Sequence, residues 1–187
     1  MAKRVRVRSI ETDLFGYKVG QDLINSKKKG DNNERQATKW LYLWTGERFI
    51  RTPSSGGRRL ENASNFCGDV VCENENFNFL FAVETKHLKK ITFDPILRNN
   101  SAIFTIWEQA RRDADRAGKL PMLMLRENGM SIGSYILFFS QQFYEGIKHQ
   151  GLNVVSKGIN KDGERIYGFT SEEVLEKINY KKLGSFS

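Results

Sequence analysis

The sequence predicts one α/β domain with a mixed central β-sheet flanked by helices. Its 187 residues are 39% apolar and 12% aromatic, which is enough for one hydrophobic core. A strand, a helix and a strand follow one another between residues 77 and 125, an order that favours a parallel pair joined by a crossover. No internal repeat or low-complexity linker divides the chain. We therefore expect a single domain over residues 1–187, with residues 134–187 as a C-terminal extension.

The N-terminal segment, residues 1–28, is basic. Residues 1–10 alternate basic and apolar side chains, which indicates an edge strand or a basic arm. Glycines interrupt residues 11–30, and Lys27–Lys29 predicts a solvated loop that serves either solubility or a phosphate contact.

A helix follows, and Asp31–Asn33 supplies N-cap residues for it. Its apolar stripe has helical spacing and comprises Ala37, Trp40, Leu41 and Trp44. Glu34 lies at the N-terminal end of that buried stripe. Helix geometry alone favours a structural role for Glu34, with a role inside a site as the alternative.

Residues 48–51 predict a short strand, and Thr52–Arg59 reads as a turn-rich loop. The loop is basic and carries hydroxyl groups, so it suits a phosphate, although a plain connection is the simpler interpretation.

The central stretch is a predicted hairpin over residues 68–86, with a polar turn at 73–76. Side chains alternate along a strand, so Glu84 and Lys86 share a face. If Asp69 on the first strand meets that face, two carboxylates and one ammonium converge. Carboxylates this close repel each other unless a cation lies between them, and Mg²⁺ prefers such oxygen ligands. The backbone carbonyl of Thr85 would be a further ligand.

A Glu-x-Lys pair on a strand is often only a solvated salt bridge. Three features favour a site here: the apolar residues 77–83 precede Glu84, apolar neighbours flank Asp69, and the acidic spot lies in a basic chain. The chemistry that fits is metal-assisted phosphodiester hydrolysis, with Lys86 facing the negative charge of the transition state.

The rest of the chain predicts alternating strands and helices. We expect a helix over 101–117, a buried strand over 122–125, a strand then a short helix over 134–148, a hairpin around 161–163 and a helix over 171–178.

The net charge of +8 and a pI of about 9.5 favour a polyanionic partner, first of all nucleic acid. No stretch is long and apolar enough to span a membrane, and the N-terminus lacks the apolar part of a signal peptide. We expect a cytoplasmic protein without a membrane partner.

The ordered motifs resemble the PD-(D/E)xK nuclease superfamily, and most of all the archaeal-type Holliday junction resolvases and their phage relatives. The resemblance covers roughly residues 29–126 and rests on Lys29-Gly30 with Glu34-Arg35, Arg51–Gly57, Gly68-Asp69, Glu84–Lys86, and Trp107–Ala110 followed by Pro121–Leu125. It implies a restriction-endonuclease-like core. The family's usual proline before the aspartate is replaced by Gly68.

The resemblance also implies roles for individual residues. Asp69, Glu84 and Glu34 would be metal ligands, which reverses the structural interpretation of Glu34, and Lys86 would be the catalytic lysine. Ser55 or its neighbour Ser54 would be the loop serine near the scissile phosphate, and Gln109 would face the site. The cofactor would be Mg²⁺, with Mn²⁺ as a substitute. The residues expected to contact DNA are Lys29, Arg35, Arg51, Ser54, Arg58, Arg59, Lys89 and Lys90.

The resulting hypothesis is a Mg²⁺-dependent, structure-selective DNA endonuclease that resolves Holliday junctions as a homodimer in the cytoplasm of a phage host. The alternatives are another PD-(D/E)xK nuclease acting on linear duplex and a non-catalytic nucleic-acid-binding protein. The apolar run at residues 136–139 is a candidate dimer interface, with a place in the core as the simpler interpretation.

Overall fold

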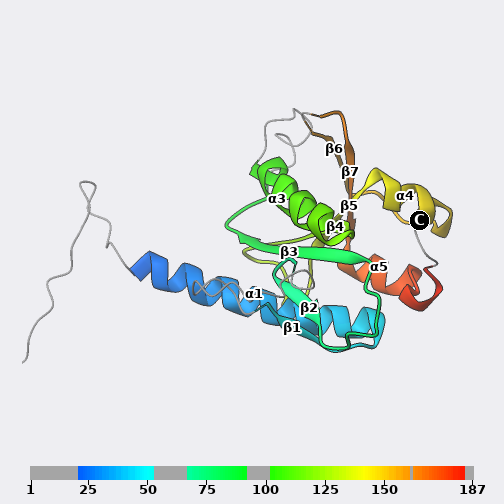
Figure 1. The fold of residues 1–187 in the computed structure, drawn as a ribbon. Helices are drawn as coiled ribbons and strands as arrows, with labels where there is room; N and C mark the ends of the chain where they lie inside the picture. The colour runs from blue at the N-terminus through cyan, green and yellow to red at the C-terminus, as the bar shows by residue number, and fades with distance from the viewer. Residues whose placement is uncertain (1–20, 53–66, 92–101, 161, 184–187) are drawn as a thin grey trace, which may run out of the picture.

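A mixed sheet forms the centre of the described part of the protein (Figure 1) and has seven strands there. The computed structural model describes residues 21–52, 67–91, 102–160 and 162–183. The sheet order is β1-β2-β3-β4-β5-β7-β6, and only β3 and β4 run parallel to each other. The strands are β1 (Phe49–Arg51), β2 (Val70–Cys72), β3 (Phe81–Leu88), β4 (Leu120–Glu127), β5 (Ile136–Ser140), β6 (Ser156–Ile159) and β7 (Arg165–Thr170).

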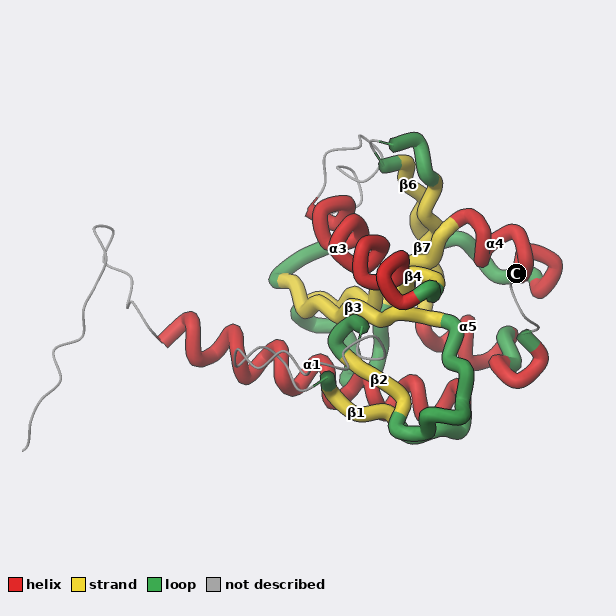
Figure 2. Tube along the Cα trace, viewed as in Figure 1, coloured by secondary structure: helices red, strands yellow, loops and turns green. Residues whose placement is uncertain are grey.

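Helices cover both faces of this sheet, as Figure 2 shows for α1 and α3. Within the described residues the α-helices are α1 (Gln21–Thr45), α3 (Ala102–Ala117), α4 (Gln141–Ile147) and α5 (Ser171–Lys177), with 3₁₀ turns at Lys148–Gln150 and Tyr180–Lys182. Apolar side chains of α1, α4 and α5 share one core with β3, β4 and β5. The other face packs against α3, where Trp107 is fully buried. Burial of a large apolar side chain contributes about 2–3 kcal/mol, so both faces stabilise the sheet.

The predicted crossover is confirmed. The helix α3 connects β3 to β4, and these strands pair in parallel over eight residues, from Phe81 opposite Leu120 to Leu88 opposite Glu127. Small alanines on the buried stripe of α3, Ala110 and Ala114, are 2% and 0% exposed. They allow the helix to lie close to the sheet beside Glu84.

The first helix begins earlier than its cap residues predict. It runs from Gln21, so Lys27–Lys29 are helical and the prediction of a loop there is wrong. Gly30 lies inside the helix, where it costs only about 1 kcal/mol relative to alanine. Hydrogen bonds hold this turn, since Lys29 donates to Asn128 and the Asn33 carbonyl accepts from Tyr135. The predicted stripe itself is confirmed, since Ala37 and Leu41 are fully buried.

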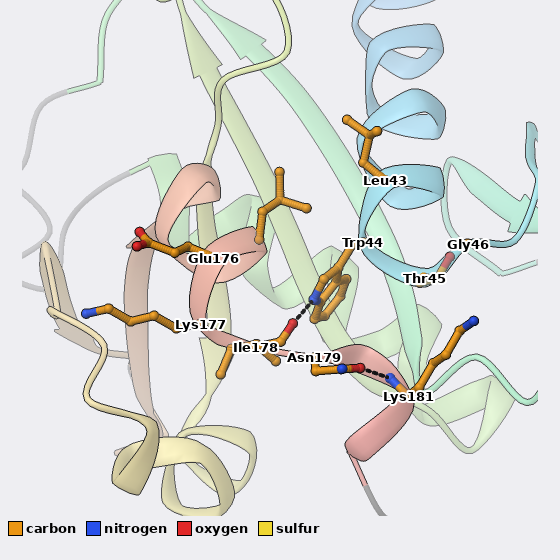
Figure 3. A pocket seen from close by; sticks show the side chains of 10 residues that line it. Leu43, Trp44, Thr45, Gly46, Glu176, Lys177, Ile178, Asn179 and Lys181 are labelled. Carbon is orange, nitrogen blue, oxygen red and sulfur yellow. Dashed lines mark hydrogen bonds between the residues drawn. The ribbon is translucent and has the colours of Figure 1, made fainter.

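The C-terminal segment completes the same sheet. Its strands β5, β7 and β6 extend the sheet beyond β4. Leu137, Phe138 and Phe139 are 0% exposed, so this run belongs to the core and is not a dimer interface. After α5 the chain returns to α1, where Trp44 Nε1 donates to the Ile178 carbonyl at 2.9 Å (Figure 3). A pocket of about 470 Å³ opens between these two segments, and none of its lining residues is a candidate site residue.

Candidate active site

Glu84 and Lys86 occupy the same face of β3, as their spacing predicts. The side chain of Glu84 is 2% exposed, and Lys86 Nζ lies 2.8 Å from Glu84 Oε1. Across from them on α3, Gln109 Nε2 donates to the same oxygen at 2.9 Å. The face of the sheet that carries this pair is therefore the one covered by α3, and two donors fix the buried carboxylate.

Gly68 brings Asp69 to this pair. Its φ of +82° suits glycine, and a Cβ at this position would lie 2.4 Å from the Val83 carbonyl oxygen. Proline, with its φ near −65°, cannot adopt this conformation, which explains its replacement before the aspartate. Thr52 holds the turn from the other side, because its Oγ1 donates to the Gly68 carbonyl at 2.7 Å.

The contact of Asp69 with Thr85 settles the register that the sequence left open. Val70 pairs with Val83 in the antiparallel β2–β3 ladder, so Asp69 lies just before the strand and opposite the Glu-x-Lys segment. Asp69 Oδ2 accepts a hydrogen bond from the Thr85 backbone N–H at 2.8 Å. The two carboxylates therefore flank the peptide unit between Glu84 and Thr85.

This arrangement is electrostatically strained for Glu84. Burial, together with the negative charge of Asp69, raises the pKa of Glu84 to about 7, although Lys86 opposes the shift. Burial would lower the pKa of Lys86, but its hydrogen bond to Glu84 and the charges of Asp69 and Glu34 outweigh that effect and raise it. Lys86 is therefore a cation at neutral pH, and a further cation would stabilise the ionised form of Glu84.

Glu34 on α1 also acts on the charge of Lys86, but its carboxylate is paired with Arg51. Arg51 Nε donates to Glu34 Oε2, and Arg51 Nη2 donates to Asp31 Oδ1 at 2.6 Å. A residue expected at the metal thus pairs with a residue expected at the DNA. Sequence reasoning missed Asp31, although its position three residues before Glu34 on a helix was a usable signal.

The donor set fits a hard divalent cation only in part. Asp69 and Glu84 are two carboxylates beside a backbone carbonyl, and Mg²⁺ binds through one or two carboxylates plus water. Among the residues that the structure describes, no group of three or more His, Cys, Asp or Glu side chains lies close enough to hold a metal ion. Glu34 would have to leave Arg51 to join the other two.

The remaining predicted contact residues are scattered around this centre. Lys89, Lys90 and Arg35 are exposed, whereas Lys29 Nζ donates to Asn128 Oδ1 at 2.8 Å. The predicted loop residues Ser54, Ser55, Arg58 and Arg59 lie outside the described residues.

A mixed sheet that presents Asp just before one strand and Glu-x-Lys on the neighbouring strand, with a helix covering them, is the arrangement expected of a PD-(D/E)xK nuclease. The phage putative PDDEXK endonuclease family matches residues 25–183, and the chain belongs to that family. Nucleases of this superfamily generally use divalent metal ions. No curated protein and no solved structure matches the chain. Within the described residues, no helix is long and apolar enough to cross a membrane.

Proposed function

We propose that the protein is a Mg²⁺-dependent, structure-selective DNA endonuclease that resolves four-way junctions. The observation that supports cleavage is the buried Glu84 with Lys86 and Gln109 on one carboxylate oxygen and Asp69 bonded to the adjacent peptide. The junction preference rests on the resemblance of the motif series to resolvases. It also fits a basic chain that contacts phosphates rather than base edges.

Each side chain of the site has a distinct task in this proposal. Asp69 and Glu84, with the Thr85 carbonyl, would hold the metal ion, and Glu34 would be a further ligand once released from Arg51. A divalent cation held there would supply charge neutralisation of the phosphate oxygens and a lowered pKa for a water molecule. Lys86 faces the charge that develops on the phosphate, where a pre-positioned cation stabilises the transition state. Gln109 and the Thr85 N–H keep the two carboxylates oriented.

The loop serine and the outer basic residues complete the proposed substrate contacts. Ser54 or Ser55 binds near the scissile phosphate, and the DNA backbone is held by Lys29, Arg35, Arg51, Arg58, Arg59, Lys89 and Lys90. Mn²⁺ replaces Mg²⁺ in the same ligand set because it also accepts oxygen donors.

Cleavage of labelled DNA tests the site. Glu84→Ala and Lys86→Ala should each reduce Mg²⁺-dependent cleavage by about a hundredfold or more. Glu145 and Lys148 provide a matched control, because they form an exposed Glu–Lys pair at 2.6 Å on a different element. Their alanine variants should cut like the parent. If the Glu84 and Lys86 variants also do so, the assignment of this site is wrong. If the parent itself cuts no labelled DNA with Mg²⁺, the protein is a nucleic-acid-binding protein without catalysis.

A second comparison separates the junction hypothesis from its alternative. A synthetic four-way junction and linear duplexes with the same arm sequences are cleaved in parallel at equal phosphate concentration. Preference for the junction supports a resolvase. Equal rates on both substrates would leave a PD-(D/E)xK nuclease that acts on linear duplex.

We also propose that two copies act together, so that both strands of a junction are cut in the cytoplasm of the phage host. The exposed apolar side chains Tyr42 and Leu43 of α1, 52% and 70% exposed, offer a surface for the second copy. Light scattering of the parent and of Leu43→Glu tests this, and a monomeric parent at assay concentration would contradict it.

A further inference from the structure

A second polar cluster lies on the face of the sheet opposite Glu84, between α1 and the ends of β3 and β4. Strand alternation places His87 on this face, and the parallel register puts it beside Arg126. On α1, Lys29 and Asn33 are one turn apart and share a face. We call Asn33, His87 and Arg126, with Lys29 at the margin, the Arg126 cluster.

Hydrogen bonds to neighbouring residues hold the members of this cluster in place. Tyr135, which is fully buried, donates from its hydroxyl to the Asn33 carbonyl at 3.1 Å. Arg126 Nη2 donates to the Met130 carbonyl at 3.0 Å. At the margin, Lys29 donates to the Asn128 side chain, which also bonds to His87.

Several buried polar atoms of the cluster have no hydrogen-bond partner among the described residues. They are Asn33 Nδ2, Asn33 Oδ1, Arg126 Nε and His87 Nε2. Asn33 is 1% exposed and Arg126 is 7% exposed. An unsatisfied buried polar atom costs about 1–3 kcal/mol, and such atoms are rare in folded proteins. Tyr135 bonds to Asn33, and the charge of Arg126 acts on Tyr135, so both side chains lie in the same neighbourhood. Two side chains there with this cost indicate that something else completes their hydrogen bonds.

The chemistry of the cluster favours an anion. Its charged members are cations, and burial together with the charges of Lys29 and Arg126 lowers the pKa of His87. The acidic residues of the same helix, Asp31 and Glu34, are paired with Arg51. A guanidinium, an amide and an imidazole provide the donors that a tetrahedral oxyanion requires.

We propose that the Arg126 cluster binds a phosphate group. It is separate from the nuclease site, because His87 and Arg126 lie on the face covered by α1 and Glu84 on the face covered by α3. Two ligands could supply this phosphate group, namely free inorganic phosphate and the terminal phosphate of a DNA strand. The proposal does not depend on cleavage, so it is tested without divalent metal.

Isothermal titration of the full chain with inorganic phosphate, at constant ionic strength, measures the binding. We expect one site in the parent. Arg126→Met should weaken binding at least tenfold, and Asn33→Leu, an apolar replacement of similar size, should weaken it severalfold. Lys39→Met is the matched control, because Lys39 is exposed on the same helix. The affinity of Lys39→Met for inorganic phosphate should equal that of the parent.

Competition by a short oligonucleotide identifies the source. Displacement of phosphate only by the 5′-phosphorylated form assigns the cluster to a DNA end, and displacement by neither the phosphorylated nor the 5′-hydroxyl form assigns it to free phosphate. Either result supports a phosphate site. The absence of phosphate binding by the parent overturns the proposal, as does unchanged binding by Asn33→Leu. That second variant decides the matter if Arg126→Met does not fold.

Discussion

Arg51 holds Glu34 through a direct ion pair, Nε to Oε2, and binds Asp31 with another nitrogen of the same guanidinium. The pair connects β1 to α1 across 17 residues of sequence. One partner was expected at the metal and the other at the DNA. In the absence of DNA, therefore, the charge of Arg51 is neutralised by Glu34, and the charge of Glu34 by Arg51.

Arg51→Gln should release Glu34 and raise the affinity for Mg²⁺ in the absence of DNA. Partly exposed ion pairs contribute about 1 kcal/mol or less, so the gain should be at most about fivefold. Titration calorimetry with Mg²⁺ measures it. Arg48→Gln is the control, since Arg48 is also paired with a glutamate but its side chain is 79% exposed. A lower Mg²⁺ affinity in Arg51→Gln would show that Glu34 needs Arg51 to be held in place.

The metal-free protein should lose stability as the pH rises from about 4.5 to 7. The pKa of Glu84 is raised to about 7, so the folded state binds more protons than the unfolded state across this window. The contribution of Glu84 to the free energy of unfolding should therefore fall by on the order of 3 kcal/mol between these limits. Thermal unfolding of the parent and of Glu84→Gln measures the difference.

The Glu84→Gln variant is the reference for the pH dependence of stability that Glu84 causes. Burial lowers the pKa of His87 and raises that of Glu164, and both groups are present in both proteins. Only the difference between parent and variant reports Glu84, and Mg²⁺ should reduce that difference. A pH-independent difference would contradict the raised pKa.

Gly68→Ala should disable the site without touching a charged group. The added Cβ meets the Val83 carbonyl, so the turn must move and Asp69 with it. A displacement of about 1 Å at a reacting group reduces the rate by about a hundredfold. Gly129→Ala is matched for backbone strain, because its φ is +94° but nothing lies within 4 Å of its Cβ. It should lower the melting temperature slightly and leave cleavage intact. Equal cleavage by both variants would contradict this role of Gly68.

Gln109→Leu should reduce cleavage by about tenfold, which corresponds to the lower end of the contribution of a hydrogen bond to a charged group, about 1.5 kcal/mol. Its amide is one of two donors to Glu84 Oε1, and Lys86 remains as the other. Cleavage rates at saturating Mg²⁺ measure the effect. Gln142→Leu, an exposed glutamine on α4, should cut like the parent. A loss as large as that of Glu84→Ala would mean that Gln109 contacts the substrate directly.

DNA binding should weaken steeply as salt rises, since lysine and arginine contacts release counterions. Removing both Lys89 and Lys90 should lower the slope of log affinity against log salt by about 2. Lys181 and Lys182 are also exposed, and their removal serves as the comparison. A flat salt response in the parent would contradict recognition dominated by phosphate contacts.

The sequence predicted the central pair because strand alternation alone determines it. Glu84 and Lys86 share a face in any strand, and the apolar residues before them predict that this strand is buried. The parallel crossover to β4 can also be predicted from the sequence, because a strand, a helix and a strand in that order have few possible arrangements. These features depend on local periodicity.

The contacts of Asp69 and Glu34 cannot be predicted from the sequence in the same way. Asp69 reaches Thr85 only because Gly68 adopts a positive φ under Val83, and periodicity does not report such a turn. The pairing of Glu34 with Arg51 depends on how α1 lies against β1, which is a tertiary relationship. The start of α1 differs from the prediction because glycines and a lysine run indicate a loop, whereas Lys27–Lys29 and Gly30 are helical.

The hydrogen bond from Trp44 to Ile178 joins residues 134 positions apart, and Leu80 donates to the Tyr180 hydroxyl across 100 positions. Contacts this distant in sequence form late and slow the folding of a chain. During translation, residues 178–180 must leave the ribosome before α1 and the loop ahead of β3 gain these partners. The support of the candidate site is thereby linked to the synthesis of residues 178–180, so that a nascent chain that already contains Asp69 and Glu84 still lacks part of the core behind them.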